Sequence, residues 1–214
     1  MVRQTQGDYI EARSFLEQAL LIQENLPGQN QLDIAARLNN LGVLLKIQED
    51  YTGALTYFKR SLAIREEALG HHPDTALSLN NLGGLLQAQR DYRGAQDCYK
   101  RALAIYKQTL GENHPDTALC LSNLGMIYQI RHAYAKAQTH YERALAIMEQ
   151  TLGNDHPKLV QILNNLGMLS KLQRNYQRAK SYFQRALIIC RTQLGSEHPY
   201  TQTVQNNLAS LGKH

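Results

Sequence analysis

Four histidines stand next to a proline, and histidine is the commonest metal ligand among protein side chains. A zinc site needs its ligands to converge at about 2 Å from one ion. Successive histidines of this set are 42 residues apart, which places each in a different part of the chain. We therefore expect them to cap helices or to pack within loops, and we predict no metal and no other cofactor. The four residues are His72, His114, His156 and His198.

Arginines recur at nearly the same spacing and offer a second kind of chemistry. Guanidinium groups bind phosphate well, so a phosphate-binding stripe is one interpretation. The other is an exposed helical face whose arginines have acidic neighbours such as Glu66 and Glu149. We favour the second, because a net charge of +5 permits acidic partners but does not by itself indicate nucleic acid. The arginines are Arg60, Arg101, Arg143 and Arg185, with Lys59 and Lys100 beside the first two.

Motifs for catalysis are missing from the sequence. It has no glycine-rich phosphate loop, no His-Glu-x-x-His and no nucleophile elbow. The three cysteines, Cys98, Cys120 and Cys190, show no close spacing, so we expect isolated thiols that are buried or half-buried. The sequence therefore predicts a protein that is not an enzyme.

Amide side chains recur in adjacent pairs and indicate binding. An asparagine amide has both a donor and an acceptor, so it can bond the N–H and C=O groups of another backbone. The pairs are Asn39 and Asn40, Asn80 and Asn81, Ser122 and Asn123, Asn164 and Asn165, and Asn206 and Asn207. One helical turn later come Val43, Gly84, Met126, Met168 and Ser210, and one turn further come Lys46, Gln87, Gln129 and Lys171.

These residues share a period because the whole sequence repeats. Glycines of recurring Leu-Gly steps are 41, 42 and 42 residues apart, and a tyrosine follows each after nine residues. A fixed period of this length is typical of stacked units that bury their apolar faces against their neighbours. The second unit has one loop residue fewer, which explains the step of 41. The glycines are Gly42, Gly83, Gly125 and Gly167.

Each unit predicts two helices. In the clearest unit, Pro115 suits the first helical position and Asp116 favours the positive end of the helix dipole. The apolar spacing predicts a first helix, helix A, that ends near His132, and a second, helix B, from about Tyr134 to Leu152. The glycine of helix A lets helix B approach closely. The aromatic residues of the helix B stripes are therefore interpreted as core: Phe58, Tyr99, Tyr141 and Phe183.

The recurring pattern Leu-x-x-Leu-Gly, followed by Tyr-x-x-Ala-x-x-x-Phe/Tyr-x-x-Ala, resembles the tetratricopeptide repeat. That repeat has about 34 residues, whereas the longer unit here, with its His-Pro-Asp-Thr and Leu-Asn-Asn-Leu-Gly, is similar to the kinesin light chain subclass. The resemblance covers almost the whole chain. It implies a right-handed superhelix in which helices A line a concave groove that holds peptides.

The predicted fold is all-α, a right-handed solenoid of antiparallel helix pairs with about ten helices. Tyr9, Ala12, Leu16 and Ala19 form a helix B that no full helix A precedes. Gln202 to Leu211 form a helix A with no helix B after it, and Ala209 stands there in place of the glycine. The predicted organisation is one repeat domain with an unpaired helix B at 1–28, repeats at 31–70, 73–111, 115–153 and 157–195, and a final helix A at 199–214.

Helical geometry also predicts a free face. With about 100° per residue, the asparagine pairs point away from the stripe that contacts helix B. We therefore expect a non-catalytic scaffold that binds an extended peptide with apolar anchors and some acidic residues. Helices about 8–10 Å apart would bring one asparagine pair to about every third peptide residue. The alternative is that the asparagines bond within or between neighbouring helices and only hold the stack together.

Two other functions stay open. One is an RNA-binding helical repeat that reads one base per unit, for which the basic bias and the recurring arginines are the support. The other is a structural segment whose unfinished ends stack end to end or onto further domains of a larger protein. No apolar run approaches the roughly 18 residues of a membrane helix, and the N-terminus lacks the apolar core of a signal peptide. We therefore expect a cytoplasmic protein without a membrane partner.

Overall fold

The computed structural model describes residues 14–15, 17–18, 20 and 30–212, and within them every regular element is a helix. The residues predicted to form the unpaired helix B (Tyr9, Ala12, Leu16 and Ala19) lie outside this part. The complete helices are α2 (Gln31–Ile47), α3 (Tyr51–Leu69), α4 (Pro73–Ala88), α5 (Tyr92–Thr109), α6 (Pro115–Ile130), α7 (Tyr134–Leu152), α8 (Leu159–Leu172), α9 (Tyr176–Gln193) and α10 (Pro199–Ala209).

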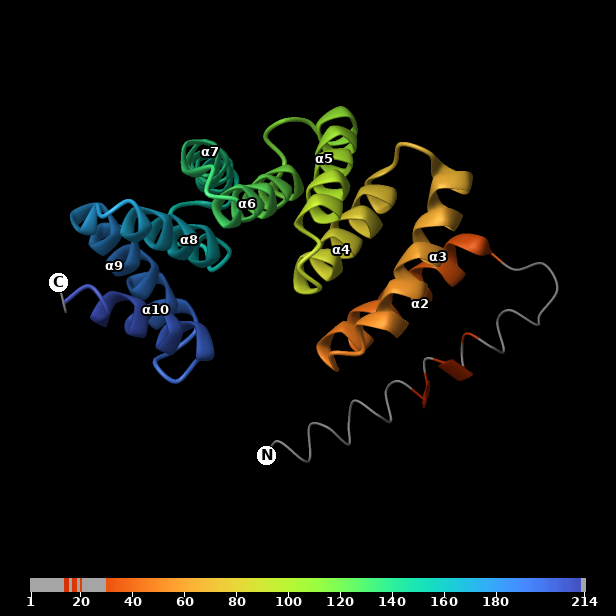
Figure 1. Ribbon diagram of the computed structural model, residues 1–214, viewed down its shortest axis with the longest axis horizontal. Coiled ribbons are helices and arrows are strands. Elements are labelled where there is room, and N and C mark those ends of the chain that lie inside the picture. Colours follow the sequence, from red (N-terminus) through yellow and green to blue (C-terminus); the bar gives the residue numbers. More distant parts are fainter. Residues whose placement is uncertain (1–13, 16, 19, 21–29, 213–214) are drawn as a thin grey trace. The chain divides into compact units, whose positions relative to one another are not determined.

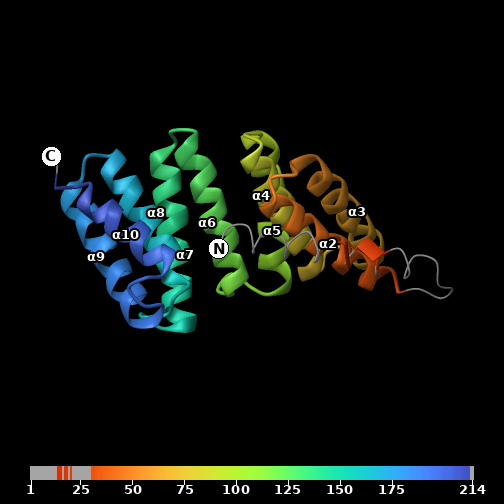
Figure 2. The same cartoon turned by 90° about the horizontal axis from the view of Figure 1, so that it is seen from below.

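The chain forms two compact units, Met1–Thr109 with α2 to α5 and Leu110–His214 with α6 to α10. Within each unit, consecutive helices pack against one another, and α2 contacts α4 just as α6 contacts α8. Figure 1 shows the helix pairs of each unit, and Figure 2 shows the same pairs from below. The even-numbered helices are the predicted helices A, and the odd-numbered ones are the predicted helices B.

Glycine is what lets each pair close. A Cβ placed on Gly42 would lie 2.7 Å from the Phe58 ring, and one on Gly167 would lie 2.5 Å from the Phe183 ring. Both rings are completely buried. The same arrangement joins Gly83 with Tyr99 and Gly125 with Tyr141. The aromatic residues of helices B are therefore core residues, as predicted.

The turns follow the repeat as well. Glycines with positive φ come directly after or within two residues of each helix B, at Gly70, Gly111, Gly153 and Gly195. Between helices A and B, the left-handed position is held instead by residues with a side chain, at Glu49, Arg90, His132 and Arg174. Helix A of the clearest unit accordingly ends at Ile130, two residues before His132.

One helix starts later than its counterparts. Proline is the first residue of α4, α6 and α10, whereas Pro157 and Lys158 form a turn and α8 begins at Leu159. Lys158 stands where α4 and α6 have Asp74 and Asp116. A positive charge is unfavourable at a helix N-terminus, where an aspartate is favourable. This substitution is consistent with the shorter helix.

Candidate functional site

Helices A carry a stripe of exposed apolar residues. Val43 and Ile47 of α2 are 37% and 56% exposed, Leu77 of α4 is 39% exposed, and Leu172 of α8 is 50% exposed. Val43 and Ile47 are four residues apart and so lie on one face of α2. Leu172 occupies in α8 the repeat position that Ile47 has in α2. Together with Asn40, Met126 and Met168, these residues form what we call the helix A face, described separately in each unit.

The sequence analysis identified Val43 but missed Ile47, Leu77 and Leu172. A signal for Ile47 and Leu172 was available, because each lies four residues beyond a predicted binding residue, Val43 or Met168. Leu77 lies four residues before Asn81 on the same stripe of α4. Periodicity alone shows that such positions share a face, but it does not show which of them a neighbouring helix covers.

Several of the predicted asparagines bond one another. Asn81 Nδ2 of α4 donates to Asn39 Oδ1 of α2 at 2.9 Å, and Asn207 Nδ2 of α10 donates to Asn164 Oδ1 of α8 at 2.8 Å. Both bonds join the first asparagine of one repeat to the second asparagine of the next. We call each such bond a rung. These four amides therefore bond across neighbouring helices A, as the structural alternative expects.

Between α6 and α8 the rung is not formed. Ser122 holds the first position there and Asn165 the second. Ser122 Oγ and Asn165 Nδ2 are both buried and have no hydrogen-bond partner. Ser122 is 3% exposed and Asn39 is 6% exposed. The first member of a pair thus lies beneath the helix A face at these two positions.

The two predicted lysines differ in their surroundings. Lys171 Nζ donates to Ser210 Oγ at 2.7 Å, which joins α8 to α10. Lys46 Nζ lies 3.0 Å from the place where a Cβ on Gly84 would be. Gly84 is the counterpart of Ser210, so the hydroxyl that Lys171 uses is missing in the first unit. Burial lowers the pKa of Lys46.

The predicted glutamines join helices A to helices B. Tyr99 Oη donates to Gln87 Oε1 and Tyr141 Oη donates to Gln129 Oε1, each at 3.2 Å. Burial strongly raises the pKa of Tyr141, so its hydroxyl stays a donor. Of the remaining predicted residues, Asn40 is exposed, and the partly exposed ones are Asn80, Asn123, Met126 and Met168.

Three of the recurring histidines, His72, His114 and His198, are the N-caps of α4, α6 and α10, as predicted, whereas His156 bonds within the turn of Pro157 and Lys158 that precedes α8. The Nδ1 atom of each accepts a hydrogen bond from the backbone N–H two residues later, at 3.1 to 3.2 Å. In this role the ring nitrogen replaces the oxygen of the usual capping residues. Among the residues that the structure describes, no group of three or more His, Cys, Asp or Glu could hold a metal ion.

The recurring arginines are largely paired with neighbours in the preceding repeat or loop. Arg101 forms an ion pair with Glu66, and Arg185 forms one with Glu149. Arg143 donates to Asn113 Oδ1 at 2.8 Å. These contacts support the interpretation of the arginines as an outer face with acidic or polar partners, which we favoured over a phosphate-binding stripe.

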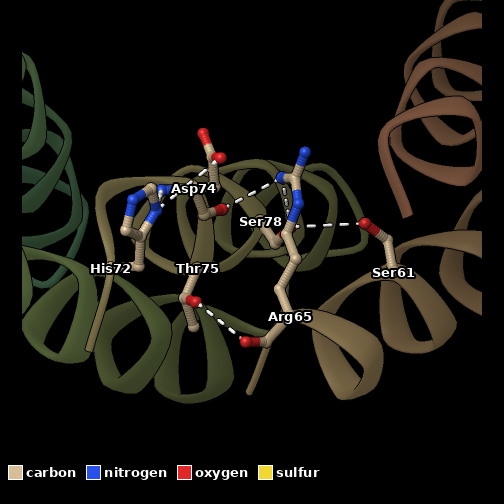
Figure 3. Close-up of polar contacts among 6 residues, drawn as sticks. All are labelled: Ser61, Arg65, His72, Asp74, Thr75 and Ser78. Atoms are coloured by element: carbon tan, nitrogen blue, oxygen red, sulfur yellow. Dashed lines mark hydrogen bonds and ion pairs between the residues drawn. The ribbon is translucent and has the colours of Figure 1, made fainter. Parts of the chain in front are cut away.

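A buried arginine forms a polar cluster between α3 and α4 (Figure 3). Arg65, only 6% exposed, donates from Nη1 to Asp74 O at 3.0 Å and to Ser78 Oγ at 2.8 Å. Ser78 lies 3.4 Å from Ser61 Oγ, which donates to Ala35 O of α2 at 2.7 Å. Burial lowers the pKa of Arg65, and the charge of Asp74 counteracts this. The cluster joins three helices and so has a structural role.

A hollow of about 510 Å³ lies between the end of α3, the loop after it and α5. Its walls include the ion pair of Glu66 and Arg101 and the hydrogen bond between His71 and Gln108. The loop 70–72 is one residue shorter than its counterparts, whose residues Asn113 and Asn154 bond Arg143 and Arg185. None of the predicted binding residues lines this hollow.

Comparisons with known proteins agree with the repeat analysis. The family model of the tetratricopeptide repeat matches residues 1–67, 33–108, 74–150, 121–187 and 160–211. A search of curated proteins found no match. Among the residues described, no helix is long and apolar enough to cross a membrane.

Solved structures of repeat proteins are similar to this chain. BtubC (BKLC) from P. vanneervenii is 28% identical, with a TM-score of 0.77 over 92% of this chain and 78% of that one. A putative kinesin light chain from Podospora anserina with tetratricopeptide-like repeats is 22% identical, with a TM-score of 0.71 over 86% and 87%. The apo form of RapI is 21% identical, with a TM-score of 0.77 over 100% and 80%.

Proposed function

Because the chain belongs to the tetratricopeptide repeat family, we propose that it is a non-catalytic interaction module whose helix A face binds an extended segment of another protein. The observation that carries this proposal is the set of exposed apolar residues on helices A. Val43, Ile47, Leu77 and Leu172 are half of the eight large hydrophobic residues found exposed in the described part of the chain. Gathered apolar residues on a surface are typical of interaction sites.

Some of the predicted binding residues form hydrogen bonds within the stack of helices. The rungs and the bonds of Gln87 and Gln129 hold helices A against their neighbours. The contact surface is then provided by Asn40, Val43, Ile47 and Leu77 in the first unit, and by Asn123, Met126, Met168 and Leu172 in the second. Methionine adapts its shape to different partners, which suits a surface that holds an irregular segment.

Charge favours a segment that also carries acidic residues. Lys46 lies beside the apolar residues of α2, and no hydrogen bond or ion pair of its ammonium group is found in the described part of the chain. Lys46 is half-buried, and both its Nζ atom and the Tyr99 hydroxyl lie close to the place where a Cβ on Gly84 would be, at 3.0 and 3.6 Å. A carboxylate of the partner would supply the missing acceptor.

A selection experiment tests the proposal. Peptides of 12 residues would be selected from a random library against the wild-type chain, and the best binder would be measured by fluorescence polarisation. We expect Ile47→Ser to weaken the binding of a peptide held by the first unit, and Leu172→Ser that of a peptide held by the second, each by about tenfold or more, as for residues at the centre of an interface. Ile188→Ser is the matched control, because Ile188 is 62% exposed but lies on helix B α9.

Two results would contradict the proposal. One is a library that yields no binder for the wild-type chain although the protein is folded. The other is a peptide whose affinity falls no more with either helix A variant than with Ile188→Ser. A single-stranded RNA probe measured at two salt concentrations completes the experiment, since tight and salt-sensitive binding would favour the RNA-binding alternative.

A further inference from the structure

Within the two units, three pairs of neighbouring helices A could form a rung, and one pair does not. The pairs α2/α4 and α8/α10 are each joined by two asparagines. In α6/α8, the serine at position 122 replaces the first asparagine, and its side chain is one bond shorter. From the register of the other two rungs, we expect Ser122 Oγ and Asn165 Nδ2 to face one another between the two helices.

The serine leaves two buried polar atoms without a partner. Ser122 Oγ and Asn165 Nδ2 are the buried side-chain atoms found without a hydrogen bond in the part of the chain that the structure describes. Folded proteins bond nearly all such atoms, often through an internal water, because an unpaired buried donor is costly. Both groups can donate, Asn165 through its amide and Ser122 through its hydroxyl. Two donors that face one gap are suited to an oxygen acceptor.

We propose that the gap between Ser122 and Asn165 is a binding site for a single acceptor oxygen, which a water occupies in the free protein and a backbone carbonyl of the bound segment occupies in the complex. The second part rests on the proposed function. It assigns one main-chain contact of the ligand to the second unit, between α6 and α8.

The residues around the gap allow a carbonyl to enter. Met126 lies four residues after Ser122, and Met168 lies three residues after Asn165, so both neighbour the gap on their own helices. Both methionines are partly exposed on the helix A face. Their unbranched side chains change rotamer easily, and such a change would open the buried donors to a ligand that lies on that face.

A small amide probe tests the site without a peptide. N-methylacetamide, which has the carbonyl and N–H of a peptide bond, would be titrated into the isotope-labelled full chain while the side-chain amide signals of Asn165 are followed by NMR. We expect saturable shifts in the wild type. Ser122→Asn fills the gap with a third rung, and Ser122→Ala removes one donor, so each should weaken probe binding about fivefold or more. Ser181→Asn is the matched control, because Ser181 is exposed on α9.

Two outcomes would overturn the inference. The Asn165 signals of the wild type could fail to shift, or they could shift with the same affinity in Ser122→Asn and Ser122→Ala. Circular dichroism of each variant establishes that it is folded, and Ser122→Ala keeps the test valid if Ser122→Asn does not fold. A selected peptide that binds Ser122→Asn and wild type equally refutes the carbonyl site alone, whereas the absence of any selected peptide refutes the proposed function alone.

Discussion

Replacing Gly167 by alanine tests whether the absence of a side chain at this position of α8 is what lets α9 pack closely. The new Cβ would lie 2.5, 2.7 and 2.8 Å from Cε1, Cδ1 and Cζ of Phe183. Carbon atoms pack best at about 3.5–4.0 Å, so the ring would have to move by roughly 1 Å. Overpacking of this kind costs about 1–3 kcal/mol, and the better helix propensity of alanine returns about 1 kcal/mol. Because this is the shortest of the four glycine–ring distances, we expect a net loss of about 1–2 kcal/mol in the free energy of unfolding.

Urea unfolding followed by circular dichroism at 222 nm measures this loss. The informative comparison is a double-mutant cycle with Phe183→Leu, which removes the ring from the glycine. In the leucine background only the propensity term remains, so Gly167→Ala should be neutral or should stabilise by up to about 1 kcal/mol. If the alanine variant is as stable as wild type, or costs the same in both backgrounds, the glycine does not act by admitting the ring.

Three further predictions concern stability. Ser122→Asn should raise the free energy of unfolding by about 1 kcal/mol, since it completes a buried hydrogen bond, while Ser181→Asn should change it little. Equal effects of the two variants in urea unfolding would contradict the formation of a rung between residues 122 and 165. Arg65→Met alone should lower the free energy of unfolding by about 1–3 kcal/mol, because the acceptors of Arg65 lose their donor. Adding Ser61→Ala and Ser78→Ile should restore wild-type stability, because the three residues then match Ala144, Met148 and Ile162 of the later repeats. A triple variant that is no more stable than Arg65→Met would refute this. Burial raises the pKa of Cys120 from near 9 to about 12, so above pH 9 the unfolded chain loses a proton that the folded chain keeps. The free energy of unfolding should therefore fall by about 1 kcal/mol between pH 8 and pH 10. In urea unfolding, Cys120→Ala should lack this part of the fall.

Much of the fold could be predicted because each repeat contains its own local signals. Helix α7 has the predicted bounds, since apolar spacing, a preceding turn and Gly153 all act within one segment. The buried glycine–ring pairs could be predicted because the two residues recur together at a fixed distance. The histidine caps of α4, α6 and α10 could be predicted because each of these histidines stands immediately before the proline that begins the helix.

The helix A face was harder to predict because recurrence has two explanations. Asparagines that bond one another repeat with the unit just as asparagines that bind a ligand do, so Asn39 and Asn81 looked alike in the sequence. The exposure of Ile47 and Leu77 depends on which neighbouring helix covers them. The cluster of Arg65 could not be predicted either, since its acceptor Ser78 lies 13 residues later in the next repeat, and only the packed register brings the two together.

The buried guanidinium of Arg65 also affects which repeats dock against one another during folding. Similar repeats can dock in the wrong sequence while they fold, which is a common error of repeat proteins. If α3 met α8 instead of α4, Arg65 would face Ile162 in place of its acceptor Ser78, and Lys158 in place of Asp74, whose charge counteracts the cost of burying the guanidinium. Only α4 offers a serine at that position, since the counterparts in α6, α8 and α10 are Cys120, Ile162 and Val204. Arg65 thus stabilises the docking of α3 against α4 and disfavours its docking against the similar helices of other repeats.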